Sequence, residues 1–508
     1  MKYSLLLLWG VITLYSCKVT QRFPRNDQKI DITFVQVNDV YEISTVSGGK
    51  EGGLARLATL KNQLLSKNPN TVMVMAGDYL SPSVFNSLKY HGKRIRGAQM
   101  VDAMNVAGFD FAIPGNHEFD ITGEEWQARV DESRFDIIAS NSFHEVNGVL
   151  QPFFQHHSTD STALPGYLIK TYIDKDGTSA RIGYIGITLP FNKADYVGYS
   201  DPLQTAKELY NKIKDSCDAV VAITHQAMAE DQQLADSLPG LALIMGGHEH
   251  DMRFDKRGNI YITKAHANAR TAYVINMEIN KKRRTIEVEP VLTPVDEQLG
   301  FDPKTQAVVD KWMNIADSSY ASLGFEARKV VYTVKDSLEA RESIIRQRAS
   351  NFTDIIVRAM KKAAPLSDLV IMNAGSIRLD DILQSPVTQY DIIRALPFGG
   401  GIREVMMKGS LLKKLLMTGL ENKGIGGYLH CYPVTFDEAA AEWKLNGQSL
   451  QDETVYRVAL TDFLLTGGEA HMEFLTPGNP GIVEVLPAQT DPGNPLSDIR
   501  LAIIRYLE

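Results

Sequence analysis

Cysteine is scarce in this sequence, which has three cysteines among 508 residues. Cys217 and Cys431 lie far apart, so their spacing gives no disulfide framework, and a chain this long does not need one. Basic charge is not in excess either, because 53 lysines and arginines face 61 aspartates and glutamates. The net charge of −8 lacks the positive footprint of a protein that binds nucleic-acid polymers. It leaves phosphate chemistry open, since bound metal ions can supply local positive charge.

The apolar run at the start of the chain, Leu5–Leu14, is short. A helix needs about 20 apolar residues to cross a bilayer, so this run is not expected to span one. Lys2 precedes it and Ser16-Cys17 follows it, which is the layout of a signal peptide. A small residue before a cysteine resembles the lipobox of bacterial lipoproteins, which implies removal of residues 1–16 and acylation of Cys17. The exported protein would then be periplasmic or anchored to the outer membrane through Cys17; plain secretion, with Cys17 incidental, is the alternative.

The length of the chain and its pattern of apolar segments predict two domains. A chain of 508 residues exceeds what one hydrophobic core usually supports. Short apolar segments alternate with helical stretches in the first half, which favours an α/β layered domain, and no repeat or low-complexity tract interrupts them. The expected strands are Ile32–Val37, Val72–Met75, Ile137–Ala139, Ile182–Ile187, Ala219–Thr224 and Leu241–Met245. We expect a tether over 17–29, a first domain over 30–294, a connector over 295–330, and a smaller α/β domain over 331–508.

The connector is expected to contain an amphipathic helix. Asp302 is a typical N-cap, and Pro303 follows at the first helical position, where proline is favoured. Val308, Trp312 and Ile315 then recur at helical spacing, which is typical of an amphipathic helix.

Five polar segments follow predicted strands of the first domain. They are Asn38-Asp39-Val40-Tyr41, Gly77-Asp78, Gly115-Asn116-His117-Glu118, Thr224-His225 and Gly246-Gly247-His248-Glu249-His250. Loops at the carboxyl ends of strands in α/β folds gather in one crevice, so these side chains are expected to converge. Carboxylate, amide and imidazole groups together suit divalent zinc, manganese, iron or cobalt. A lone histidine or Gly-Asp pair is more often structural, but the ordered set predicts a metal site.

The ordered set resembles the motifs of the calcineurin-like metallophosphoesterases, and Gly115-Asn116-His117-Glu118-Phe119-Asp120 is similar to their 5′-nucleotidase branch. The resemblance implies a β-sandwich flanked by helices that holds two divalent metal ions, such as zinc or manganese. The resemblance implies that Asp78 binds both ions. Asp39 and His250 would bind one ion, and the other would be bound by Asn116, His225 and His248.

The same resemblance implies the reaction. Two cations clamp a phosphate and activate a bridging water, so that hydroxide attacks phosphorus in line. His117, positioned by Asp120, is expected to stabilise the developing charge and to protonate the leaving alkoxide.

Two residues in these motifs need separate interpretation. Members of the superfamily usually have histidine two residues after the first aspartate, and this chain has Tyr41 there. Because a phenol is a poorer ligand than an imidazole, Tyr41 is expected either to bind one metal weakly or to lie just behind the ligands. Glu249, between two histidines, is expected to face away from them as a solvated residue.

Four blocks of the second domain resemble the 5′-nucleotidase C-terminal domain. They are Arg346-Gln347-Arg348, Asn373-Ala374-Gly375-Ser376-Ile377-Arg378, Leu396-Pro397-Phe398-Gly399, and Asp462-Phe463-Leu464 with Gly467-Gly468-Glu469. Two aromatic rings are suited to stack on a nucleotide base, and two arginines to bind phosphate oxygens bidentately. The implied substrate-binding residues are Phe398 and Phe463 for the base, Arg346 and Arg378 for phosphate, Asn373 for the ribose or base, and Glu469 for the ribose hydroxyls.

These segments predict a metal-dependent hydrolase that removes the 5′-phosphate from nucleotides and can extend to nucleotide sugars or diphosphates. The expected partner is a small-molecule nucleotide, with the membrane reached only through the N-terminal anchor. One alternative is a phosphoesterase for another small phosphate ester. Another is a nucleotide-binding protein with an impaired metal site, for which Tyr41 is the sequence support.

We predict that Cys17→Ala converts a membrane-associated protein into a soluble one. An acyl chain on Cys17 would carry the mature protein into a detergent phase, and alanine cannot be acylated. Detergent phase separation of both variants, with mass spectrometry of the N-terminus, measures this. An unmodified N-terminus at Lys18 or beyond would contradict the lipid anchor.

Overall fold

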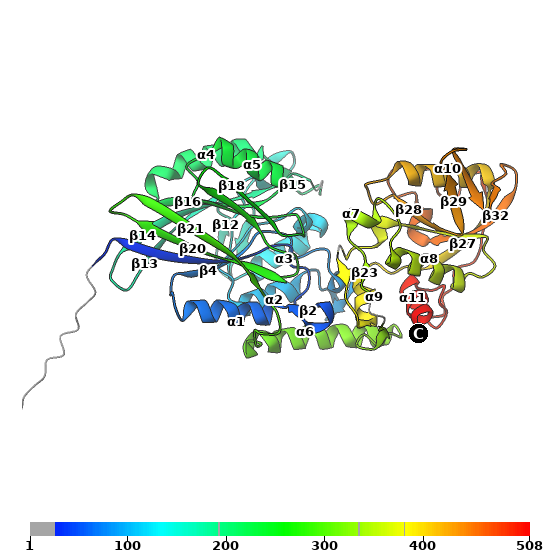
Figure 1. The fold of residues 1–508 in the computed structure, drawn as a ribbon, viewed down its shortest axis with the longest axis horizontal. Coiled ribbons are helices and arrows are strands. Elements are labelled where there is room, and N and C mark those ends of the chain that lie inside the picture. The colour runs from blue at the N-terminus through cyan, green and yellow to red at the C-terminus, as the bar shows by residue number, and fades with distance from the viewer. Residues whose placement is uncertain (1–25, 192–193, 334–335, 380) are drawn as a thin grey trace, which may run out of the picture.

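The computed structural model describes residues 26–191, 194–333, 336–379 and 381–508, and Figure 1 shows two domains side by side. The predicted signal peptide and Cys17 lie outside the described residues. Within the described ranges, no helix combines the length and the apolar character needed to cross a membrane. Cys217 and Cys431 are both free thiols.

The first domain contains two six-stranded sheets that pack face to face. The first sheet has, in spatial order, β21 (Thr285–Pro294), β20 (Thr271–Asn280), β1 (Lys29–Val37), β4 (Thr71–Met75), β7 (Phe111–Ala112) and β8 (Asp136–Ile137). The second has β13 (Tyr167–Ile173), β14 (Ser179–Thr188), β16 (Ala219–His225), β17 (Leu243–Gly247), β19 (Ile260–Lys264) and β18 (Arg253–Arg257). Phe34 and Tyr184 meet edge to face between the sheets, with ring centroids 6.3 Å apart.

The inner strands of both sheets run parallel, so their carboxyl ends lie at a common edge. Every residue of β4 and β16 is buried, because helices cover the outer face of each sheet and the other sheet covers the inner face. Burial on both faces explains why these strands are continuous apolar runs in the sequence. All six predicted strands are confirmed, with ends that differ from the expected ones by a few residues.

Helices complete a four-layer arrangement. The first sheet packs against α1 (Leu54–Leu65), α2 (Ala98–Ala107) and α3 (Gly123–Glu132). The second packs against α4 (Pro202–Ile213) and α5 (Met228–Ser237). The predicted β-sandwich flanked by helices is therefore confirmed.

The connector helix, α6 (Pro303–Ser322), runs along α1 and α2 (Figure 1). The carboxylate of Asp302 accepts a hydrogen bond from Thr305 N at 2.9 Å, as expected of an N-cap. The buried stripe of α6 is formed by Thr305, Val309, Trp312, Ala316 and Tyr320. Val308 and Ile315 are half-buried and pack against the same apolar cluster, so the predicted amphipathic helix is confirmed. Trp312 donates to Asp102 of α2 at 2.9 Å, and this contact fixes the rotation of the helix.

The second domain is a five-stranded sheet between helices. Its strands are, in spatial order, β28 (Leu429–Tyr432), β24 (Leu369–Asn373), β32 (Val455–Thr461), β27 (Ile402–Lys408) and β33 (Ile482–Val485). One face packs against α8 (Asn351–Ala363) and α11 (Ile499–Leu507), and the other against α10 (Gly409–Glu421). Two short helices, α7 (Glu342–Ile345) and α9 (Gln389–Ala395), lie toward the first domain (Figure 1).

Short strands form smaller sheets around the two domains. They are β2 (Thr45–Val46), β3 (Glu51–Gly52), β5 (Lys89–Tyr90), β6 (Lys93–Arg94), β9 (Ser142–Val146), β10 (Val149–Gln151), β11 (Phe154–His156), β12 (Ser161–Ala163), β15 (Val197–Tyr199), β22 (Val330–Tyr332), β23 (Leu338–Glu339), β25 (Ile382–Leu383), β26 (Val387–Thr388), β29 (Val434–Asp437), β30 (Glu442–Leu445) and β31 (Gln448–Ser449).

The two domains are joined by more than the connector. One cluster of buried apolar side chains continues from α1 and α2 through α6 to α8 and α11. Tyr390 Oη of α9 donates to Glu42 at 2.8 Å, and Arg270 forms an ion pair with Asp381. The second domain is therefore held next to the loop that carries Asp39 and Tyr41.

Candidate metal centre and the adjoining cleft

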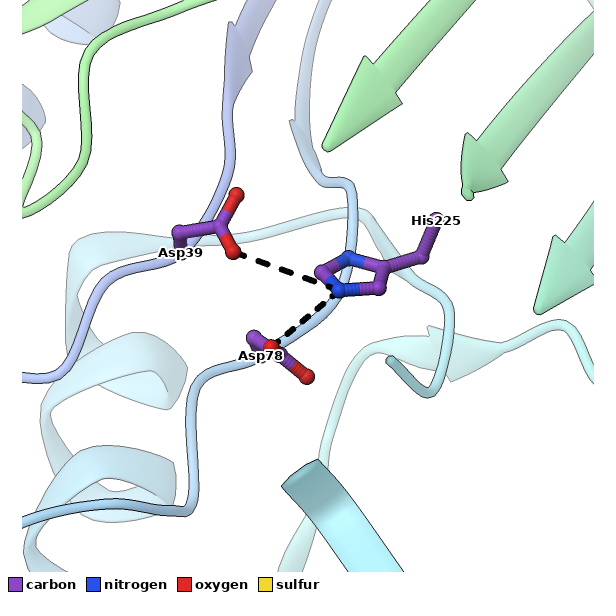
Figure 2. Close-up of side chains that lie close together, drawn as sticks. All are labelled: Asp39, Asp78 and His225. Carbon is purple, nitrogen blue, oxygen red and sulfur yellow. Dashed lines mark ion pairs between the residues drawn. The ribbon is translucent and has the colours of Figure 1, made fainter. Parts of the chain in front are cut away.

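Asp39, Asp78 and His225 meet where β1, β4 and β16 end (Figure 2). His225 Nε2 lies 3.1 Å from Asp78 Oδ2 and 4.0 Å from Asp39 Oδ1. All three side chains are buried. The parallel strands thus bring together residues that are up to 186 positions apart, as the difference between 39 and 225 shows.

The protonation of His225 indicates what this cluster attracts. Its Nδ1 lies 2.8 Å from the Ala76 carbonyl oxygen, which can only accept, so Nδ1 carries a proton and Nε2 faces the two carboxylates. Burial by itself lowers the pKa of His225, but the carboxylates of Asp78 and Asp39 outweigh it and raise the pKa to about 9. The buried cluster therefore favours positive charge between its members. Its donor set fits a metal cation.

One oxygen of each carboxylate accepts hydrogen bonds from neighbouring loop residues, and the other oxygen lies toward His225. Asp39 Oδ2 accepts from Asn38 Nδ2 at 2.8 Å and from His248 N at 3.0 Å. Asp78 Oδ1 accepts from His117 N at 2.9 Å. These hydrogen bonds fix the two carboxylates before any ligand arrives.

Two glycines of the motifs are required by close approach. A Cβ on Gly115 would lie 2.1 Å from Asp78 Oδ1, and one on Gly77 would lie 2.5 Å from His225 Nδ1. Gly77 also has a φ of +83°, a conformation that side chains disfavour. The glycines next to the predicted ligands are thus part of the geometry of the site.

The remaining predicted ligands lie at the same edge. The His248 ring packs edge to face on His225, with centroids 5.5 Å apart, and burial together with His225 lowers its pKa to about 4. His248 is therefore neutral near pH 7, as a ligand must be. His250 Nε2 lies 3.5 Å from Asp39 Oδ1, and Asn116 is buried just before the short helix η3 (His117–Asp120).

Tyr41 lies among these groups. Its Oη is 3.3 Å from Asp39 Oδ1, 3.3 Å from Asp78 Oδ2 and 3.0 Å from His250 Nε2. The phenol therefore occupies the position at which the sequence pattern leads one to expect an imidazole.

His117 is the first residue of η3, directly after Asn116. Its Nδ1 lies 2.6 Å from Asp120 Oδ2, and the side chain is 27% exposed. Burial lowers the pKa of His117, but the charge of Asp78, the hydrogen bond that His117 donates to Asp120 and the charge of Asp120 raise it overall. The imidazole is thus held in one orientation with its other nitrogen available to a ligand.

Glu118 has a larger part in the site than the sequence indicated. Its fully buried carboxylate accepts hydrogen bonds from the backbone N–H groups of Asp78 at 2.8 Å, Tyr79 at 2.7 Å, Leu80 at 2.9 Å and Gly115 at 2.5 Å. Burial and the charge of Asp78 raise its pKa to about 7. Glu118 therefore ties two ligand-bearing loops together. Its place inside the Gly-Asn-His-Glu motif was the signal that could have indicated this.

The prediction that Glu249 is a solvated residue was wrong. Its carboxylate accepts from Met228 N at 2.7 Å and forms an ion pair with Lys264, whose side chain is 0% exposed. Lys264 also lies 2.9 Å from Asp231 Oδ2 and donates to the Gln226 carbonyl at 2.6 Å. Burial by itself raises the pKa of Glu249, but the charge of Lys264 lowers it below the ordinary value. Lys264, which the sequence did not single out, therefore links the loops of His225 and His248.

A cleft of about 430 Å³ lies between the domains beside this centre. Its walls include Asp120 and three arginines, Arg94, Arg96 and Arg378, together with Phe398. The guanidinium of Arg378 lies 5.8 Å from the centroid of the Phe398 ring. The cleft thus joins two predicted substrate-binding residues to the neighbourhood of His117, and it adds two arginines that the sequence analysis did not select.

The other predicted residues of the second domain do not line this cleft. Asn373 Nδ2 donates to Glu469 Oε2 at 2.6 Å, and Arg346 forms an ion pair with Glu342. Phe463 is 45% exposed on the short helix η6 (Asp462–Thr466), and Phe398 is 69% exposed. The described structure records no ring contact between these two phenylalanines.

Comparison with known proteins gives two adjacent matches. The profile of the calcineurin-like phosphoesterases matches residues 32–252, and that of the 5′-nucleotidase C-terminal domain matches residues 330–476. The chain is 23% identical to the 5′-nucleotidase of Bos taurus, over 86% of this chain and 83% of that protein. It is 22% identical to the trifunctional nucleotide phosphoesterase YfkN of Bacillus subtilis, over 92% of this chain and 34% of that protein. The solved 5′-nucleotidase precursor of Thermus thermophilus shares the fold, with a TM-score of 0.65 and 20% identity over 94% of this chain and 96% of that one.

We predict that Lys264→Met strongly destabilises the protein. It would leave the buried carboxylates of Asp231 and Glu249 without their cation, and breaking a buried ion pair costs about 3–5 kcal/mol. The control is Lys281→Met, because Lys281 makes a more exposed ion pair with Asp218 at 3.3 Å, which is worth at most about 1 kcal/mol. Urea unfolding of both variants measures the difference. Equal midpoints would show that the Lys264 cluster does not hold the fold.

Proposed function

The chain belongs to the 5′-nucleotidase family of calcineurin-like metallophosphoesterases, and we propose that it is a hydrolase that removes the 5′-phosphate from nucleotides with two divalent metal ions. The buried cluster of Asp39, Asp78 and His225 carries this proposal, because its donors face one another and favour a cation. The bacterial and mammalian relatives named above support nucleotides as the substrate class. We propose nucleotide sugars and diphosphates as further substrates.

We assign the ligands as follows. Asp78 is shared by both ions; Asp39 and His250 complete one site; and Asn116, His225 and His248 complete the other. Zinc and manganese suit such a mixture of carboxylate, amide and imidazole donors. Bound ions would neutralise the phosphoryl oxygens and make water more acidic at the site.

We assign His117 to the leaving group. Its raised pKa favours the protonated imidazole, which can stabilise developing negative charge and give a proton to the departing alkoxide. Asp120 Oδ2 lies 2.6 Å from His117 Nδ1, so the Nε2 atom of the same imidazole points away from Asp120. The adjoining cleft is lined by Asp120, so a phosphate ester in it would lie close to this pair.

We assign recognition of the nucleotide to the second domain. Arg378 reaches the cleft and is close enough to His117 for its charge to affect the pKa of that imidazole. Phe398 and Phe463 are exposed enough to receive a base, and Arg346 would provide a second guanidinium for phosphate. Asn373 Nδ2 donates a hydrogen bond to Glu469 Oε2 at 2.6 Å, and the remaining polar atoms of both side chains would hydrogen-bond the ribose.

We also propose that the protein is exported and anchored through Cys17. The lipobox-like segment Leu14-Tyr15-Ser16-Cys17 supports this, and the test is the Cys17→Ala comparison given above.

His117→Ala is expected to lower kcat by about 10²–10⁴-fold while metal content stays unchanged, since general acid catalysis is worth that much. Phosphate release from AMP and elemental analysis measure the two quantities. Wild-type kcat in the variant would remove His117 from the chemistry.

Asp120→Asn tests how His117 is held. Asp120 raises the pKa of His117, so its loss lowers that pKa. An acid must be protonated to act, and activity is lost as pH rises through its pKa. The alkaline limb of the kcat profile should therefore move to lower pH in Asp120→Asn. A limb that does not move would limit Asp120 to supporting the loop.

Phe398→Ala combined with Phe463→Ala is expected to lower kcat/KM for nucleotides by about 10²–10³-fold, because each stacked ring contributes roughly 1–3 kcal/mol with incomplete additivity. Hydrolysis of bis(p-nitrophenyl) phosphate, which needs only the metal centre, should stay within a few-fold of wild type. Phe301→Ala is the control, because Phe301 is 47% exposed and packs on Arg56 rather than on the cleft. Equal losses on both substrates would mean that the rings serve the fold, and equal retention would favour a phosphoesterase for other esters.

A further inference from the structure

The hydroxyl of Tyr41 is surrounded by side chains that the preceding section assigns to a metal ion. Tyr41 is 7% exposed and lies on the loop that follows β1. Its Oη approaches Asp39 Oδ1 and Asp78 Oδ2 at 3.3 Å each and His250 Nε2 at 3.0 Å. Three atoms that can accept protons therefore converge on one phenol oxygen.

Hydrogen bonding alone does not account for this convergence. A phenol has a single proton, so it can donate to only one of the three neighbours. The distances of 3.3 Å to the carboxylates are long for an O–H···O bond, which is usually about 2.7–2.8 Å. The phenol proton therefore accounts for only one of the three approaches.

The same distances suit a shared cation. Donors about 2.0–2.2 Å from one metal ion are separated from each other by roughly 3.0–3.5 Å when they occupy neighbouring coordination positions. The pairs Tyr41–Asp39, Tyr41–Asp78, Tyr41–His250 and His250–Asp39 are 3.3, 3.3, 3.0 and 3.5 Å apart. These four separations therefore fall in the range expected of neighbouring ligands of a single ion.

We propose that Tyr41 binds the ion of the Asp39–His250 site directly through Oη, in place of the imidazole that the family pattern puts there. The inference rests on the proposed function only in assuming that a metal binds. On binding, the O–H bond breaks, the proton leaves to solvent, and both electrons stay on the phenolate oxygen. The ion then has three anionic oxygens, from Tyr41, Asp39 and Asp78, and one nitrogen, from His250.

This donor set predicts which metals the site prefers. Oxygen donors with negative charge suit hard ions, whereas imidazole-rich sets suit zinc. Replacing an imidazole by a phenolate therefore shifts the Asp39–His250 site toward iron or manganese. The second site, with Asn116, His225 and His248, has no such donor and keeps its imidazole character.

Ferric iron is the probe for direct ligation. A phenolate bound to ferric iron absorbs visible light through charge transfer, and carboxylates and imidazoles do not. The full-length protein is stripped with a chelator and reloaded with ferric iron, and its visible spectrum is recorded. We expect a band in the unaltered protein and none in Tyr41→Phe. The control is Tyr196→Phe, because Tyr196 donates to the Ile121 carbonyl at 2.9 Å rather than to a proposed ligand, and it should keep the band.

Metal content gives a second, independent measure. After loading with manganese and gel filtration, Tyr41→Phe should lose roughly one of two equivalents. Tyr41→His should recover both equivalents, show no visible band with iron, and take up zinc in preference to manganese. It also provides the comparison if Tyr41→Phe does not fold.

Three results would overturn the assignment: iron bound to the unaltered protein without a visible band, the same band in Tyr41→Phe, or equal manganese content in Tyr41→Phe and wild type. None of these measurements uses a substrate. A visible band from Tyr41 without nucleotide hydrolysis would therefore reject the proposed function and leave the ligand assignment standing.

Discussion

The site depends on two carboxylates that are buried side by side next to His225. Asp39 and Asp78 are 0% and 1% exposed, and a buried charge is costly unless it is paired. Burial raises the pKa of Asp39 even though His225 and His250 oppose that effect. The backbone is strained at the same place, since φ is +53° at Asp39, +57° at Asp78 and +86° at His248. Such conformations cost about 1–3 kcal/mol each and persist where function requires them.

Glu118 and Lys264 connect the loops that carry the candidate metal ligands. Glu118 accepts hydrogen bonds from the backbone of Asp78 and of Gly115, so it connects the loops after β4 and β7. Lys264 does the same for the loops after β16 and β17 through Gln226 and Glu249. Neither residue needs to touch a ligand for this role. Together they pre-organise donors from four strands, which spares a bound ion the cost of ordering them.

The two domains contribute different groups to the proposed site. The proposed metal ligands all come from the first domain, whereas Arg378 and Phe398 reach the cleft from the second. Binding energy from the remote part of a substrate can then position its phosphate over the metal centre. The shared apolar cluster and the Tyr390–Glu42 hydrogen bond keep the two parts in contact. Pockets at domain interfaces commonly serve ligands for this reason.

The inner strands, the cap of α6 and the segments that carry the candidate metal donors can be predicted from the sequence alone, because apolar runs, N-caps and glycine-rich turns act over a few residues. Tertiary structure decided the pairings between distant segments. Tyr41 meets His250 across 209 positions, and Lys264 reaches Asp231 and Glu249 from another strand. Contacts with α1 and α2 decide that Val309 and Ala316 are fully buried while Val308 and Ile315 pack at the edge of the same cluster. Periodicity shows which side of an element is apolar, but only packing and sheet register show what that side touches.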